Sequence, residues 1–446
     1  MNREQNMTIG SPIKLIITFM IPLVLANLGQ QLYMIVDAII VGQGVGVIAL
    51  AAVGATDWPY WLVLWIILAL CQGFAIPIAQ YFGINDKLQV KKAIAKTIQL
   101  CLGLAILLTI LFLAVATPLL QALQTPDDVF SGASTYLHIM YGGIIIVMAY
   151  NMASSILRAI GDGKTPLIAI LIAGITNVAL DLLFVLQFNW GIAGAAIATV
   201  TAQFLAFCYC FRVLWKMQLI SWEHEIWEKD FSLIKKLCSL GFPLALQHVL
   251  IAVGGMIFQS AINQQGFIFI AGFTATNKIY GLLESSAISL GYAMTTYVAQ
   301  NYGAGLYGRI RQGVKQSIII AIGLSVLISL TMIIAGKPIL SLFIDAKNEN
   351  YFQVLEIAYQ YLFVMSCFLS SLYLLNVFRN ILQGLSNTLA SFLSGVMEFF
   401  TRVFVALVLV NYFDSDILFL GEPGAWIMAM LILIIMGIKR IKALPK

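Results

Sequence analysis

The feature that most constrains this sequence is a series of long apolar runs separated by short charged segments. A helix that crosses the hydrocarbon core of a bilayer needs about 20 mostly apolar residues. We therefore predict an all-α polytopic membrane protein with twelve transmembrane helices, near residues 13–41, 56–80, 93–116, 134–157, 166–187, 191–213, 238–263, 276–300, 316–336, 354–378, 388–410 and 421–438. The first run is too long for the apolar core of a signal peptide, so we expect it to remain as a span.

The composition excludes several other classes of protein. Of the 446 residues, 61% are hydrophobic and 10% are charged, whereas soluble proteins carry about 25% charged residues. This excludes a soluble multidomain protein, a disordered chain and a nucleic-acid binder. Most Lys and Arg fall at the termini or in alternate loops, which predicts a protein of the cell membrane with both termini in the cytoplasm. Lipid is the expected surrounding, and we expect a monomer.

The two halves of the chain resemble each other at an offset of about 220 residues. Ala79-Gln80 and Gly83 in AQYFG recur as Ala299-Gln300 and Gly303 in AQNYG. Because six spans return the chain to the same side, we expect two lobes related by a pseudo-two-fold axis along the membrane normal, with a cavity between them. The predicted lobes are residues 1–214 and 237–446. Residues 215–236 are predicted as a cytoplasmic linker, or alternatively as a regulatory amphipathic segment.

Charged residues inside the spans are the candidates for function, because a charge in the membrane usually faces a cavity or a partner. Asn177 and Asp181 are four residues apart and share a helix face. Asp37, Asp181 and Thr199 all lie roughly 6–12 Å below the outer surface by helix rise. These groups could surround a monovalent cation such as Na⁺, or the acids could share a proton. The alternative is that each acid only packs helices.

The second half has its own charged residues within spans. Glu398 and Arg402 are also four apart, at the place that corresponds to Asn177 and Asp181. They either pair with each other or line a cavity. Glu284 either contacts a substrate or is a protonated carboxyl group that packs helices.

A proline lies inside the first predicted span. Pro22 weakens that helix because proline lacks the amide donor and clashes with the preceding turn. Tyr33 is one turn before Asp37 on the same helix face. The sequence permits either a helix that bends during function or a static kink.

Together these residues resemble the multidrug and toxic compound extrusion (MATE) family over essentially the whole chain. The local marks are VDAIIVGQ, LRAIGDGKTP, NVALD and GIAGAAIAT in the first half, and VAQNYGAG and QGLSNT in the second. The resemblance implies an antiporter that uses H⁺ or Na⁺ to export amphipathic, often cationic compounds by alternating access. The residues implied are a cation site at Asp37, Asn177, Asp181, Ala195 and Thr199, a bend at Pro22, and aromatic residues facing the lobe interior at Tyr33 and Tyr136.

The resemblance also bears on the branch of the family. The NorM-like branch carries additional acids in helices 7 and 10, but residues 238–263 and 354–378 contain no buried carboxylate candidate. This favours a DinF-like affinity.

Three other functions were weighed. A flippase for lipid-linked saccharides of a related fold would favour a cavity rich in arginine, and Arg402 is the only arginine well within a predicted span, away from its ends. An intramembrane enzyme is disfavoured because no His-Glu-x-x-His run or G-x-S-x-G elbow with partners is present. ATP-driven transport is disfavoured by the absence of a P-loop. We therefore expect no enzyme activity and no cofactor beyond the coupling ion.

Overall fold

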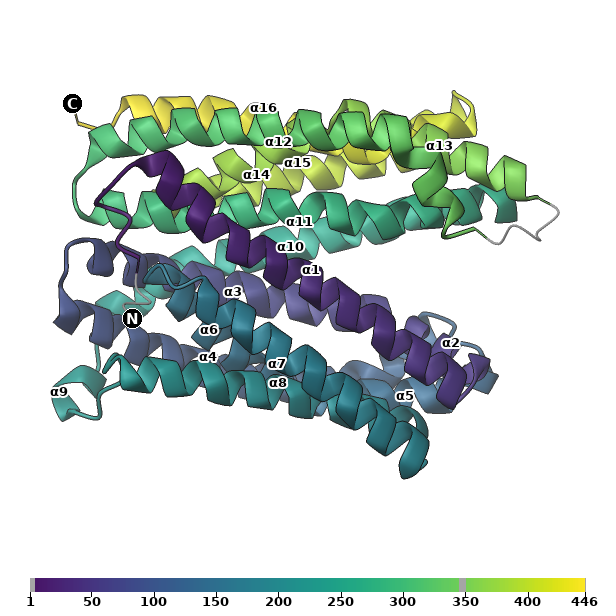
Figure 1. The fold of residues 1–446 in the computed structure, drawn as a ribbon, viewed down its shortest axis with the longest axis horizontal. Helices are drawn as coiled ribbons and strands as arrows, with labels where there is room; N and C mark the ends of the chain where they lie inside the picture. The colour runs from purple at the N-terminus through teal and green to yellow at the C-terminus, as the bar shows by residue number, and fades with distance from the viewer. Residues whose placement is uncertain (1–4, 345–349, 446) are drawn as a thin grey trace. The chain divides into compact units, whose positions relative to one another are not determined.

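The protein is a bundle of long helices. The structure is a computed structural model that describes residues 5–344 and 350–445 (Figure 1). Within these residues, nine helices are long and apolar enough to cross a membrane, and two bent helix pairs qualify as one span each. A further helix of 37 residues, Phe267–Gly303, accounts for the twelfth predicted span. The prediction of an all-α, twelve-span fold is confirmed.

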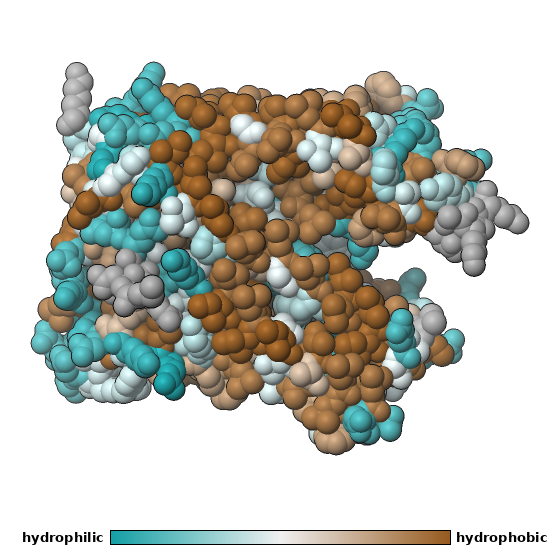
Figure 2. Space-filling view, viewed as in Figure 1, coloured by the Kyte–Doolittle hydropathy of each residue, from teal (hydrophilic) through white to brown (hydrophobic). Residues whose placement is uncertain are grey.

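The surface of the helices agrees with a surrounding of lipid. Residues on helix α4 (Lys87–Ala122) and helix α12 (Tyr307–Ser341) that face outward are mostly Leu and Ile. On the face drawn in Figure 2, hydrophobic side chains cover the middle of the helices and hydrophilic side chains gather near their ends. Exposed apolar surface of this extent is stable in hydrocarbon, where every backbone amide is satisfied within its own helix.

The described helices fall into two compact units. Unit 1 contains residues 1–6 and 21–245. Its helices, besides most of α1 (Pro12–Gly44) and the start of α10 (Phe231–Asn263), are α2 (Val47–Ala55), α3 (Asp57–Gly83), α4, α5 (Asp127–Gly142), α6 (Ile144–Ala159), α7 (Lys164–Asp181), the π-helical η1 (Leu182–Gln187), α8 (Gly191–Lys216) and α9 (His224–Trp227). Helix α3 is buried along most of its length and forms the core of this unit.

Unit 2 contains residues 7–20 and 246–446. Its helices, besides the start of α1 and the end of α10, are α11 (Phe267–Gly303), α12, α13 (Tyr351–Cys367), α14 (Leu369–Gly384), α15 (Thr388–Leu407), the short 3₁₀ turns η2 (Leu409–Asn411) and η3 (Ser415–Leu420), and α16 (Gly421–Lys442). Helices α11 and α14 are the most buried and correspond to α3 and α6 of unit 1.

This division differs from the predicted lobe boundaries. Residues 215–236, predicted as a linker between lobes, belong to unit 1. Helices α1 and α10 each contribute one part to each unit, with the divisions after Met20 and after Ala245. Pro22 and Pro243 lie inside these two helices, close to the divisions.

The internal repeat is visible in the shape of the helices. The bend between α5 and α6 is 48°, and the bend between α13 and α14 is 49°. The two halves therefore repeat a helix arrangement as well as a sequence pattern.

The AQNYG motif fixes the segment that precedes α1. The amide of Met7 donates to Gln300 Oε1 at 2.8 Å, and its carbonyl accepts from Asn301 Nδ2 at 3.0 Å and Arg309 Nη2 at 3.1 Å. The Met7 side chain is fully buried. These contacts anchor the beginning of α1 in unit 2.

In unit 1, α3 and α10 approach closely at two glycines. A Cβ atom added at Gly73 would lie 2.5 Å from the Cα of Gly241 and 2.9 Å from the carbonyl oxygen of Leu240. Both obstacles are backbone, which cannot turn aside as a flexible side chain can. The contact therefore requires glycine at position 73.

We predict that Gly73→Ala lowers the midpoint of thermal unfolding of the detergent-purified protein by several degrees. Forcing an extra methyl group into a close-packed helix contact costs about 1–3 kcal/mol. Gly103→Ala is the matched control, because a Cβ at this position in α4 meets nothing within 4 Å. Equal midpoints for the two variants would contradict the backbone contact.

Candidate functional site

Three helices of unit 1 bring the predicted cation-site residues together. Helix α1 carries Asp37, α7 carries Asn177 and Asp181, and α8 carries Thr199. Asn177 Nδ2 donates to Thr199 Oγ1 at 3.3 Å. The side chains of Asp37 and Asp181 are close enough to act on each other electrostatically. The convergence of these four side chains is what the sequence predicted from their spacing and depth.

Local sequence determines how α7 presents its polar face. The buried carboxylate of Asp162 accepts from the backbone amides of Lys164 and Thr165, at 3.0 and 2.9 Å, and so caps the first turn of α7. Gly161, just before it, has a φ of 84° and lies against the backbone of Gln5, where a Cβ would not fit. The GDGKT segment of the chain therefore starts α7 in a fixed place.

The other end of α7 is less regular. Directly after Asp181 the helix continues as the π-helical turn η1, and the amide of Phe188 bonds to the carbonyl of Leu183. Single π-helical turns are often found at functional sites, because the wider turn alters which backbone and side-chain groups are presented. Asp181 thus lies at a change of helix type.

The site holds more acceptors than donors. Asp181 and Asn177 are fully buried. Asp37 Oδ1, Asn177 Oδ1 and both carboxylate oxygens of Asp181 accept no hydrogen bond from the described residues. Two adjacent carboxylates repel each other when both are ionised, so the pair requires a proton or a metal cation. Carboxylate, amide and hydroxyl oxygens are hard ligands that suit a cation such as Na⁺ better than a soft metal.

Aromatic side chains surround these acids. Tyr33 packs against Gly174 of α7. Tyr136 of α5 is buried in a cluster with Met140 and Ala196, and its hydroxyl is in the electrostatic field of Asp37 and Asp181. Both tyrosines therefore belong to the same site as the acids.

Ala195 and Tyr60 belong to the same region of unit 1. Ala195 lies in an apolar cluster with Val41 and Val185 and offers only its backbone as a ligand. Tyr60 of α3 also lies beside Tyr33 and Tyr136, but the sequence did not single it out. Its position in an aromatic-rich apolar run gave no signal that separated it from core residues.

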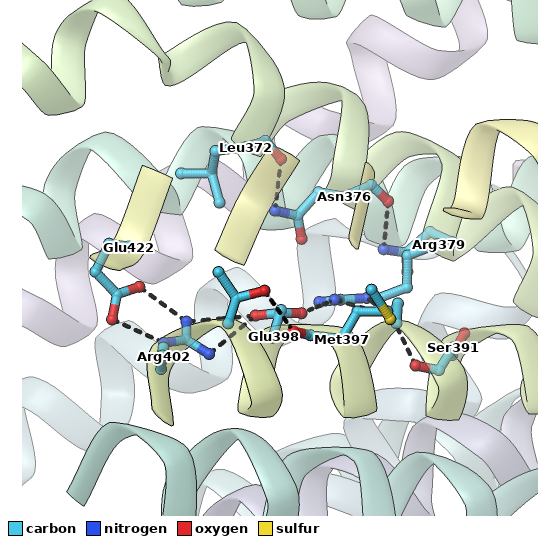
Figure 3. Close-up of polar contacts among 11 residues, drawn as sticks. Leu372, Asn376, Arg379, Ser391, Met397, Glu398, Arg402 and Glu422 are labelled. Carbon is cyan, nitrogen blue, oxygen red and sulfur yellow. Dashed lines mark hydrogen bonds and ion pairs between the residues drawn. The ribbon is translucent and has the colours of Figure 1, made fainter. Parts of the chain in front are cut away.

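Unit 2 contains a row of four charges of alternating sign, of which Glu398 and Arg402 are buried and Arg379 and Glu422 are half-buried (Figure 3). Arg379 of α14 pairs with Glu398 and also donates to Ser394 Oγ at 3.1 Å. Arg402 Nη1 lies 3.4 Å from Glu398 Oε2. Arg402 also forms a bidentate pair with Glu422 at the start of α16, at 2.9 and 2.8 Å. The row is electrically neutral, because it contains two arginines and two glutamates.

The predicted pairing of Glu398 with Arg402 is therefore only part of this arrangement. Arg379 directly follows the predicted span 354–378, yet it lies within α14 with only 11% of its side chain exposed. Glu422 was not singled out because it lies at the edge of the last apolar run. The repeat carried a signal for Arg379, since Arg158 occupies the corresponding place in the first half and donates to Ser154 and Ser155.

Glu284 lies on α11 beside this row. Its electrostatic neighbours are Tyr280, Glu398, Glu422 and Arg402, and the ring of Tyr280 stacks on Trp426 at 5.7 Å. A half-buried carboxyl group beside stacked aromatic rings can attract an organic cation. Glu284 is thus a carboxyl group additional to the neutral row.

We predict that Glu398→Gln lowers the stability of the protein markedly. The substitution removes the carboxylate that pairs with both Arg379 and Arg402. Breaking a buried ion pair on one side costs about 3–5 kcal/mol. The comparison is Glu356→Gln, which breaks the exposed pair with Lys337 and should cost under about 1 kcal/mol. Thermal unfolding in detergent measures both, and equal losses would show that the row is not a buried network.

Known proteins are similar to this chain in both sequence and fold. A sequence model described as MatE matches residues 22–183 and 243–408. The chain is 31% identical over 311 residues to the probable multidrug resistance protein YpnP of Bacillus subtilis, which covers 69% of each protein. It is 24% identical over 424 residues to the probable multidrug resistance protein NorM of Thermotoga maritima, which covers 93% of this chain and 88% of NorM.

Among solved structures, a MATE protein crystallised in the bent conformation superimposes with a TM-score of 0.89. The match covers 98% of this chain and 96% of that one at 21% sequence identity. This structural match shows that the two chains have the same fold.

Proposed function

Because the chain belongs to the MatE family of multi-pass membrane transporters, we propose that it is a secondary active antiporter that exports amphipathic, often cationic compounds in exchange for H⁺ or Na⁺. Multidrug efflux is the function of the family. The coupling ion, the site residues and the transport cycle are the parts that we infer from this chain.

The observation that carries the coupling proposal is the pair of carboxyl groups of Asp37 and Asp181 with oxygens that accept no hydrogen bond from the described residues. When a proton or Na⁺ enters, it removes most of the repulsion between the two carboxylates and draws α1 and α7 together at this depth. When the ion leaves, the two carboxylates repel and the same contact loosens. Asn177 and Thr199 supply two further oxygens for Na⁺.

The bending of α1 links this event to the rest of the unit. Pro22 lies about four turns before Asp37 and removes one backbone hydrogen bond from the helix. A helix weakened at this point changes direction at low cost, so the contact at Asp37 can alter the path of α1. Ligand-linked bending of this kind is a shift between two helix conformations that bind the ion with different affinity.

The substrate-facing side chains are the aromatic and acidic ones. Tyr33 and Tyr136 offer aromatic faces in unit 1, and Glu284 offers a carboxylate in unit 2. Glu398 and Arg402 are engaged in the row of charges and would act on substrates through their field. Aromatic and Met side chains accept varied apolar groups by repacking.

A lipid-linked saccharide flippase is the alternative within the same class of transporter. It would need free guanidinium groups for pyrophosphate. Arg379 and Arg402 are both held by glutamates, which favours the efflux proposal.

We also place this protein nearer the DinF-like branch. In the sequence of α10, the polar candidates are Gln247, His248 and Asn263, and α14 has Asn376, none of them an acid. We propose a monomer in the cell membrane with both termini cytoplasmic, since its loops of highest positive charge lie on that side.

We predict that Asp37→Asn abolishes substrate efflux that depends on an ion gradient, because a neutral amide no longer requires a cation. The assay is dye efflux from proteoliposomes with imposed proton and sodium gradients, each collapsed separately. Asp128→Asn, at an exposed acid at the start of α5, is the control and should transport as the parent does. Undiminished transport by Asp37→Asn under both gradients would reject the coupling assignment.

We predict that Pro22→Ala gives a folded protein with slower transport. Alanine at this position restores the missing amide and favours the unbroken helical conformation of α1 by up to about 3 kcal/mol. Pro118→Ala, at an outward-facing proline within α4, is the matched control. Equal turnover of parent, Pro22→Ala and Pro118→Ala in the same assay would indicate a static kink.

A further inference from the structure

We propose that Arg402 is a tethered cation that permanently fills, in unit 2, the position that the exchangeable cation takes in unit 1. As a result, the coupling ion enters and leaves unit 1 alone. This inference rests on the proposed role of Asp37 and Asp181.

The first step is the correspondence between the two halves. At an offset of 221, Arg158 matches Arg379, Asn177 matches Glu398 and Asp181 matches Arg402. Helices α7 and α15 occupy the same place in the chain order, since each follows a bent helix pair and precedes the last long helix of its half. Position 402 is therefore the counterpart of the fully buried acid of the first half.

The second step is the difference in chemistry at the two positions. In unit 1 an acid at position 181 faces a second acid, and Asp37 Oδ1 and both oxygens of Asp181 accept no hydrogen bond from the part of the chain that the structure describes. In unit 2 a guanidinium group at position 402 lies between the carboxylates of Glu398 and Glu422 and donates through Nε, Nη1 and Nη2. Each unit thus brings acids together, but only unit 2 supplies the positive charge from its own chain.

The third step concerns exchange. An arginine stays protonated at any pH a protein meets, and its covalent attachment prevents it from leaving. With 6% of its side chain exposed, Arg402 stays between Glu398 and Glu422, and together with Arg379 it balances their two negative charges. The two acids of unit 1 have no such partner and must take their cation from solution.

The experiment removes the Arg402 side chain by substitution and then adds free guanidinium ion to the solution. Arg402→Ala should lower the unfolding midpoint of the full-length protein in detergent by several degrees. Guanidinium chloride at low millimolar concentration should restore at least half of that loss, whereas urea should restore none. Arg440→Ala, at an exposed arginine in the last turn of α16, is the control and should not respond to guanidinium. A stability of Arg402→Ala that guanidinium leaves unchanged would overturn the proposal.

A second variant keeps the proposal testable if Arg402→Ala does not fold. Arg402→Met combined with Glu422→Gln removes one charge of each sign and leaves Glu398 paired with Arg379. Replacing a buried ion pair by uncharged groups is often tolerated, so this variant should fold, ignore guanidinium and keep the ion dependence of the parent. Loss of ion dependence in the folded variant would overturn the proposal, because the acids of unit 2 would then take part in coupling.

These outcomes are distinguishable from a failure of the proposed function. Retained coupling in Asp37→Asn would reject the coupling site of unit 1. Lost coupling in Asp37→Asn, together with no guanidinium rescue of Arg402→Ala, would reject only the tethered cation.

Discussion

A carboxylate in an apolar surrounding requires a positive partner, because the free energy of taking an unpaired charge out of water is several kcal/mol or more. Few of this protein's residues are charged, and those inside its helices are consequently grouped. Asp37 and Asp181 meet in unit 1, and Arg379, Glu398, Arg402 and Glu422 form a row in unit 2. Within unit 1 these charges connect α1 with α7, and within unit 2 they connect α14, α15 and α16.

The two halves satisfy the same requirement in different ways. In unit 2 the two glutamates of the row are balanced by two arginines of the same unit. Among the described residues, no arginine or lysine is paired with Asp37 or Asp181, and in the mechanism that we propose this polar group responds to the concentration of protons or cations outside. In that proposal, the duplicated helix arrangement combines a part whose charge is constant with a part whose charge changes, so that an ion gradient acts on the second without disturbing the first.

Much of this could be predicted from the sequence. The apolar runs gave the twelve spans, and the helical spacing of Asn177 and Asp181, with the common depth of Asp37 and Thr199, predicted their convergence. Arg379 and Glu422 could not be recognised, because both lie near the ends of apolar runs, where a charge normally faces water. The division of α1 and α10 between the units was also missed. Span prediction detects hydropathy, whereas that division depends on which side chains a helix contacts along its length. The π-helical turn after Asp181 has no sequence signature.

The buried contacts of Met7 limit which part of α1 can move. Its amide nitrogen is a hydrogen-bond donor to Gln300, and its carbonyl accepts from Asn301 and Arg309. Because α1 begins at Pro12, soon after these contacts, its first turns are held in unit 2. A bend at Pro22 would therefore displace the part of the helix that carries Asp37 and leave the first turns in place.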